Sequence, residues 1–120
     1  MIARVIHFGT DDCHRLMVLR SAGYAVENCG SLGQLRACLA DDSAADALLI
    51  SDSEGISLRE AAAFACAHSS LPVVLFRNTN LAYDESGFDL VVQCLTPPEV
   101  WLNDLDALIE RSRSVVRRAG

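Results

Sequence analysis

Apolar residues gather in continuous runs along the chain rather than at alternating positions. Four of these runs have the length of a strand and span residues 4–8, 47–50, 73–76 and 90–94. Continuous runs of this length are typical of parallel strands that are buried on both faces of a sheet. A weaker run over residues 24–29 mixes polar and apolar side chains, which predicts a half-exposed strand at the edge of that sheet.

Helix-start signals lie between these runs. At three places a Ser or Thr is followed three residues later by Gln or Glu, the spacing of a capping box: Ser31 and Gln34, Ser57 and Glu60, Thr96 and Glu99. Pro97 strengthens the third start because proline suits the first helical position. Behind each start, apolar residues recur at intervals of three and four, as on the buried side of a helix. A further helix over roughly residues 12–22 is predicted to end at Gly23, where glycine favours a left-handed backbone.

Strands and helices therefore alternate along the chain, which predicts an α/β fold with a doubly wound parallel sheet. Right-handed crossovers leave few ways to wind five strands, so we expect the flavodoxin-like order 2-1-3-4-5. Residues 78–86 are polar and turn-rich, and too few residues separate Arg77 from Gly87 for a full helix. Helix four is therefore expected to be shortened or missing. The length of 120 residues predicts a single domain over residues 1–120.

Composition excludes several classes of protein. The chain has a hydrophobic fraction of 51%, enough for a core without metal or disulfides, and a formal net charge of -6. Because an acidic domain repels phosphates, we expect no binding to nucleic acid. The arginine-rich segment 111–118 is expected to offset the negative end of a helix. No run is long enough to span a membrane, and none resembles a signal peptide.

The cysteines indicate a reducing environment. Cys13, Cys29, Cys38, Cys66 and Cys94 are odd in number, and no two of them form a C-x-x-C pair. We therefore expect free thiols and a cytoplasmic protein. Two of these cysteines have a histidine nearby, but neither pair has the spacing of metal ligands on one helix face, so no zinc site is assigned.

Three short stretches resemble the receiver domain of bacterial response regulators. Residues 22–26 read Ala-Gly-Tyr-Ala-Val, which is similar to the family's Gly-Tyr-x-Val between the first helix and the second strand. Residues 46–50 are similar to the Asp-Leu-x-Leu-Leu that precedes the phosphorylated aspartate, and residues 71–74 resemble the Pro-Val-Ile opening of strand four. The resemblance covers nearly the whole chain and implies a part in two-component phosphorelay signal transduction.

The resemblance also implies a set of side chains at the carboxyl edge of the sheet. In the family, two acidic residues after strand one hold Mg²⁺, and an aspartate at the end of strand three attacks phosphorus. A Ser or Thr ends strand four and a Lys ends strand five, and both contact the phosphoryl oxygens. Here the residues directly after strand one are Gly9 and Thr10, and Asp11 and Asp12 follow as a displaced acidic pocket.

The position of the phosphoacceptor is also displaced. Counting six residues from Ala45, where the family usually has proline, reaches Ser51, and Asp52 comes one residue later. A one-residue shift turns a side chain to the other face of a regular strand, but a loop at the strand end can correct this. Asp52 is therefore the preferred candidate acceptor and Ser51 the weaker one.

The cations and hydroxyls of the family are replaced as well. Arg77 stands at the Ser or Thr position, and Thr96 and Pro97 stand where the family has Lys-Pro. All ten basic residues are arginine, so no neighbouring lysine can take over. Arg77 is the candidate cation of the pocket. It either pairs with Asp52 or Asp11, because clustered carboxylates left unpaired would repel one another, or points into solvent from a loop.

Three functions follow as hypotheses. The first is a degenerate receiver, or pseudo-receiver, which has no enzymatic activity and no cofactor. It acts by contact with a protein such as a histidine kinase, an output domain or a second copy of itself. The alternative is an atypical receiver phosphorylated on Asp52, with Mg²⁺ held by Asp11, Asp12 and Asp52. The third is a small-molecule binder or enzyme on a flavodoxin-like fold. It is disfavoured because no glycine-rich phosphate loop follows strand one and no catalytic residue is identified.

Overall fold

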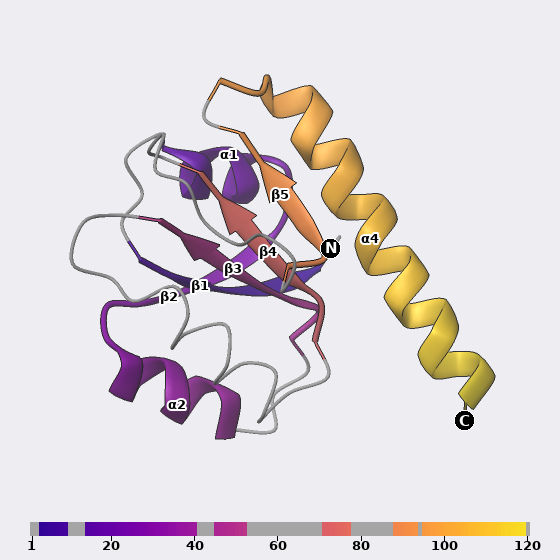
Figure 1. Ribbon diagram of the computed structural model, residues 1–120, viewed down its shortest axis with the longest axis horizontal. Coiled ribbons are helices and arrows are strands. Elements are labelled where there is room, and N and C mark those ends of the chain that lie inside the picture. Colours follow the sequence, from indigo (N-terminus) through magenta and orange to yellow (C-terminus); the bar gives the residue numbers. More distant parts are fainter. Residues whose placement is uncertain are drawn as a thin grey trace.

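The computed structural model describes residues 3–9, 14–40, 45–52, 71–77, 88–93 and 95–119. In these residues all neighbouring strands are parallel and form a five-stranded sheet in the order β2-β1-β3-β4-β5 (Figure 1). The strands are β1 (Arg4–Phe8), β2 (Ala25–Cys29), β3 (Ala47–Ser51), β4 (Val73–Phe76) and β5 (Leu90–Val92). The described helices are α1 (Arg15–Ser21), α2 (Leu32–Ala40) and α4 (Pro98–Ala119). The predicted strand order and direction are confirmed.

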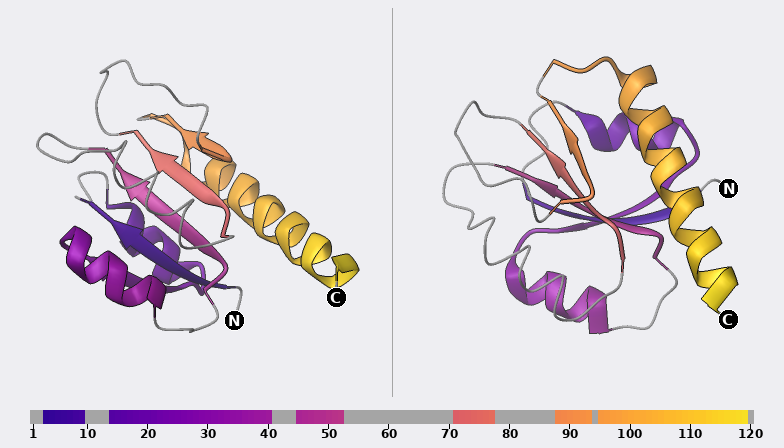
Figure 2. Two further views of the ribbon diagram at one scale, coloured as in Figure 1. Left: turned by 60° about the horizontal axis from the view of Figure 1, so that its bottom comes forward. Right: turned by 45° about the vertical axis from the view of Figure 1, so that its right-hand side comes forward.

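Helices cover both faces of the sheet (Figure 2). Side chains alternate between the faces, so each strand supplies two separate cores. On one face, inward side chains of the strands pack with α1 and α4, including Val5, Leu49, Phe76, Leu19 and Trp101. On the other face they pack with α2, including Ile6, Ile50, Leu75 and Leu35. The central strand β3 is buried along its whole length, as a continuous apolar run predicts.

Strand β2 shows the opposite pattern. It lies at the edge of the sheet, and of its residues only Cys29 is buried. The half-exposed edge strand predicted from the mixed run at 24–29 is therefore confirmed, with its first residue at Ala25.

The helix boundaries follow the predicted signals with small shifts. Helix α1 ends at Ser21, and Gly23 takes a left-handed backbone with φ of 97°. Helix α1 begins at Arg15, later than the predicted start near residue 12. Helix α4 begins at Pro98, one residue beyond the predicted first position, because the carbonyl of Pro97 already accepts the amide of Trp101 at 3.3 Å.

The capping box of α2 is slightly altered. Ser31 Oγ accepts the amide of Gln34 at 3.2 Å, as predicted. The side chain of Gln34 reaches back to the amide of Gly30 rather than to that of Ser31. The helix predicted to begin after Ser57, and the shortened helix four predicted over 78–86, lie outside the described residues.

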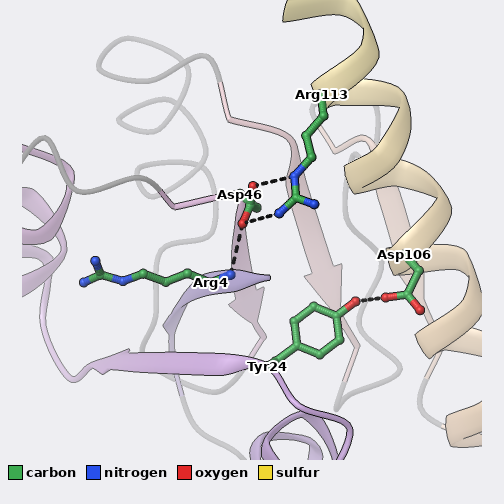
Figure 3. Close-up of polar contacts among 5 residues, drawn as sticks. All are labelled: Arg4, Tyr24, Asp46, Asp106 and Arg113. Atoms are coloured by element: carbon green, nitrogen blue, oxygen red, sulfur yellow. Dashed lines mark hydrogen bonds and ion pairs between the residues drawn. The ribbon is translucent and has the colours of Figure 1, made fainter. Parts of the chain in front are cut away.

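Helix α4 is fastened to the sheet by polar contacts (Figure 3). Arg113 Nε donates to Asp46 Oδ1 at 3.0 Å, and a second nitrogen of Arg113 lies 2.9 Å from Asp46 Oδ2. Asp46 Oδ2 also accepts the amide of Arg4 at 3.0 Å. Nearer the start of the helix, the Tyr24 hydroxyl donates to Asp106. Among the described helices, none is both long and apolar enough to cross a membrane.

Candidate functional site at the carboxyl edge of the sheet

Asp52 and Arg77 meet directly after two neighbouring strands. Asp52 follows β3, and its amide donates to the carbonyl of Phe76 at 3.0 Å, which fixes it beside the end of β4. Arg77 follows β4, and its Nε lies 3.4 Å from Asp52 Oδ2. The Asp52 side chain is fully buried and that of Arg77 is 10% exposed. Of the two placements left open for Arg77, the structure has the one that faces Asp52 rather than solvent.

The end of β1 explains why no acidic residue follows this strand at once. Gly9 has φ of 115°, and a Cβ at this position would lie 2.5 Å from the carbonyl oxygen of Ser51. Any side chain would collide with the backbone of β3 and would also strain the backbone. The position directly after strand one, where receiver domains carry acidic residues, therefore requires glycine in this chain. Asp11 and Asp12 lie outside the described residues.

Ser51 points away from Asp52 and belongs to a different group of side chains. Its Oγ lies 2.6 Å from His7 Nε2, and His7 Nδ1 lies 2.9 Å from Asn28 Oδ1. Ser51 is 1% exposed and His7 is fully buried. The three residues lie on β3, β1 and β2, so they form a polar link across three strands. This link engages the Ser51 hydroxyl, so the structure brings Asp52, and not Ser51, next to Arg77.

A second arginine binds the ends of β4 and β5. Arg15, the first residue of α1, donates from its terminal nitrogen to the carbonyls of Arg77 and Gln93, both at 3.2 Å. Its guanidinium carbon lies 4.9 Å from the ring centroid of Phe76, within the range of a cation–π contact. Arg15 is only 4% exposed, so this buried charge holds α1 against the carboxyl edge of the sheet.

Thr96 and Pro97, at the position of the family's Lys-Pro, line a pocket of about 280 Å³ beside Arg15. The other lining residues are Val18, Leu95, Pro98 and Trp101. Leu95 is 92% exposed at its rim, whereas Trp101 is 2% exposed and belongs to the core. The only cation that lines this part of the described structure is therefore Arg15.

Of the three candidate ligands for a divalent cation, the structure describes only Asp52, because Asp11 and Asp12 lie outside the described residues. Mg²⁺ needs several convergent oxygen ligands. Asp52 contacts the guanidinium of Arg77, which brings a positive charge to its carboxylate. Across the described part of the chain, no three His, Cys, Asp or Glu side chains gather into a metal-binding group.

Sequence reasoning did not single out His7 or Arg15. His7 carried a signal, because a histidine between Ile6 and Phe8 in a buried strand must find polar partners. The sequence around Arg15 gave no signal of its role, because its acceptors lie 62 and 78 residues away along the chain.

Solved structures of receiver domains share the fold of this chain. One is the N-terminal domain of a response regulator/sensory box/GGDEF protein from Carboxydothermus hydrogenoformans, with a TM-score of 0.77 and 15% identity over 94% of this chain and 98% of that one. Another is the receiver domain of the TMAO respiratory response regulator TorR, with a TM-score of 0.74 and 15% identity over 91% and 98%. A third, the receiver domain of a modulated diguanylate cyclase from Desulfovibrio desulfuricans, has a TM-score of 0.71 and 15% identity over 94% and 98%.

These comparisons define the architecture. No protein-family model matches the chain, and no curated protein matches it. The sheet order and the agreement with solved structures show a flavodoxin-like α/β fold. More particularly, the fold is that of response-regulator receiver domains.

Proposed function

We propose that this chain is a degenerate receiver: a signalling module that has kept the receiver fold and acts by protein contact, not by phosphorylation of an aspartate. The observation that carries the proposal is the buried contact between Arg77 and Asp52, with Nε and Oδ2 3.4 Å apart. In receivers the corresponding place at the end of strand four holds a small hydroxyl. Here a guanidinium lies against the only candidate acceptor carboxylate among the described residues.

The charge balance of phosphoryl transfer supports this proposal. Transfer to a carboxylate depends on positioning and on cations that face the developing negative charge on phosphorus. Arg77 instead neutralises the carboxylate itself. The lysine that the family supplies from strand five is missing, since the chain contains none. Loss of one charge-stabilising group typically costs about two orders of magnitude or more in rate.

The proposal carries three expectations for the chain. It has no enzymatic activity, needs no cofactor, and recognises a protein partner: a histidine kinase, an output domain or a second copy of itself. Its conformation is set by such contacts, because Arg77 already engages Asp52 in a buried ion pair.

Treatment with acetyl phosphate and Mg²⁺ tests the proposal directly. Intact-mass spectrometry of the wild type, an Asp52→Asn variant and an Arg77→Thr variant should show no phosphoryl adduct on any of them. Beryllofluoride with Mg²⁺ should leave the amide NMR spectrum of the wild type unchanged. A stoichiometric gain of one phosphoryl group in the wild type, lost in Asp52→Asn, would refute the degenerate receiver.

That outcome would support an atypical receiver in which Asp52 is the acceptor and Arg77 the substitute cation. One observation favours this alternative: Asp52 lies directly after β3 at the carboxyl edge, within 3.4 Å of a cation. Under the alternative, Arg77→Thr should accept phosphate more slowly than the wild type, because its cation is gone.

A further inference from the structure

Two cysteines on different elements lie in contact on the α2 face of the sheet. Cys29 is the last residue of β2, and Cys38 lies in the second half of α2. Their sulfur atoms are 3.1 Å apart. Both are free thiols, Cys29 being buried and Cys38 partly exposed. The pair differs from an isolated core cysteine because the fold brings two thiols together from positions nine residues apart.

Packing holds the two thiols in place. Leu35 is fully buried against the sheet, and Cys38 lies one helical turn further on the same side of α2. Cys29 is paired in register with Phe8 of β1, so its position is set by the sheet. A disulfide has sulfur atoms about 2.0 Å apart, so closure requires the two sulfurs to approach by roughly 1 Å. This movement is small enough for a side-chain adjustment.

We propose that Cys29 and Cys38 form a reversible redox site, which closes to an intramolecular disulfide by exchange with a low-molecular-weight disulfide such as oxidised glutathione. The inference is independent of the degenerate-receiver proposal. It does not use Asp52 or Arg77, and a failure of either proposal leaves the other standing.

The exchange proceeds in two balanced steps. Cys38, the more exposed thiol, loses its proton and attacks one sulfur of oxidised glutathione. A Cys38–glutathione bond forms, the glutathione S–S bond breaks, and one glutathione thiolate leaves. Cys29 then loses its proton and attacks the Cys38 sulfur, which expels the second glutathione thiolate. The protein dithiol is oxidised to a disulfide, oxidised glutathione is reduced to two thiols, and the two protein protons end on these thiols.

The environment of Cys29 assigns the order of these steps. Burial, followed by the hydrogen bond with Cys38, raises the pKa of the Cys29 thiol to about 12. The thiolate is the reactive form, so Cys29 is inert toward an oxidant in solution. Cys29 can attack only a sulfur that is already held beside it, because proximity raises the rate of an intramolecular attack. Cys38 therefore reacts first and Cys29 second.

The positions of the arginines allow a Cys29–Cys38 disulfide to be identified by peptide mapping. Trypsin cleaves this lysine-free chain only after arginine, and the five cysteines then fall on five different peptides. Cys29 lies on the peptide of residues 21–36, and Cys38 lies on that of residues 37–59. The full chain is equilibrated in buffers of graded reduced and oxidised glutathione, quenched with acid, alkylated and digested. Mass spectrometry should show peptide 21–36 joined to peptide 37–59, and dithiothreitol should separate them.

The same titration in concentrated urea separates the effect of the fold from that of short sequence spacing. We expect the equilibrium constant for the 29–38 disulfide to be at least about tenfold larger in the folded chain. Closure should also raise the Tm by roughly 5–10 °C, because the cross-link lowers the conformational entropy of the unfolded chain. A Cys38→Ser variant should show neither linkage nor shift. The matched control Cys66→Ser should show both.

Three results would overturn the proposal. The first is a folded chain in which Cys29 and Cys38 remain free while other cysteines form disulfides. The second is a Cys38–glutathione adduct that persists without closing. The third is an equilibrium constant for closure that is equal in urea and in native buffer.

Discussion

Strand β3 has an aspartate just before it and another just after it, and each faces an arginine. At the amino end, Asp46 and Arg113 form a two-pronged pair at 3.0 and 2.9 Å, with side chains 17% and 42% exposed. At the carboxyl end, Asp52 and Arg77 meet at 3.4 Å, with side chains 0% and 10% exposed. The chemical groups are the same, but the Asp46 pair is closer and partly exposed to solvent, whereas the Asp52 pair is longer and buried.

The two ion pairs therefore have different roles: the Asp46 pair attaches α4 to the sheet, and the Asp52 pair lies buried at the candidate functional site. The Asp46 pair remains partly hydrated, so its charges lose little solvation while they tie α4 to the sheet (Figure 3). The Asp52 pair has lost nearly all of its water, and this loss of solvation carries a large cost. A buried pair of this kind contributes little net stability when intact, but it is strongly destabilising when one partner is removed. At the carboxyl edge, the charges of Asp52 and Arg77 therefore depend on each other, and neither can be removed alone without a large loss of stability.

The largest effect is expected from breaking the buried pair on one side. Arg77→Met removes the guanidinium that faces Asp52 and should lower the free energy of unfolding by about 3–5 kcal/mol. Urea unfolding followed by circular dichroism measures this. The double variant Asp52→Asn/Arg77→Met removes both charges and should recover more than half of the loss. A loss below about 1 kcal/mol in the single variant would mean that the carboxyl-edge pair behaves like the solvated one.

A smaller effect is expected at the amino edge. Arg113→Ala removes a partly exposed ion pair and should cost about 1 kcal/mol in the free energy of unfolding. Because the pair is hydrated, the cost should shrink in high salt. Arg111, which is exposed on the same helix, provides the matched control, and Arg111→Ala should change little. If the Arg113→Ala cost is unaffected by salt, the proposed contrast in hydration is wrong.

The smallest effect concerns pH and the second polar contact of α4. Burial, followed by the nearby charge of Glu110, raises the pKa of Asp106 above its ordinary value of 3.8. The folded chain therefore binds this proton more tightly than the unfolded chain does. The contribution of this carboxyl to the free energy of unfolding should fall as pH rises from about 3.8 through the folded pKa, and then level off.

Asp106→Asn should remove that fall, whereas Asp104→Asn, at an exposed position on the same helix, should retain it. Unfolding free energies measured in steps from pH 3 to 6 distinguish the two variants. A pH profile that is identical for the wild type and Asp106→Asn would contradict the expected role of this carboxyl.

Patterns in the sequence predict the sheet well because burial on two faces leaves a run of apolar residues. The runs at 4–8 and 73–76 coincide with β1 and β4. The site is less predictable because it depends on strand ends. Counting along the chain could not decide between Ser51 and Asp52. The register that pairs Ser51 with Phe76 settles which side chain lies beside Arg77, and this register depends on how β3 and β4 align. The partners of Arg15 are even less accessible to such reasoning, because they lie at the ends of two later strands.

The packing of Trp101 gives this molecule its own optical reporter. Trp101 is the single tryptophan of the chain, so all of the indole fluorescence arises from one buried position. Its ring meets that of Phe76 edge to face, with centroids 5.3 Å apart. Phe76 is followed by Arg77 and carries the guanidinium of Arg15 on its ring. Any anion, partner or substitution that displaces the end of β4 will therefore change the emission of a label that is already in the sequence.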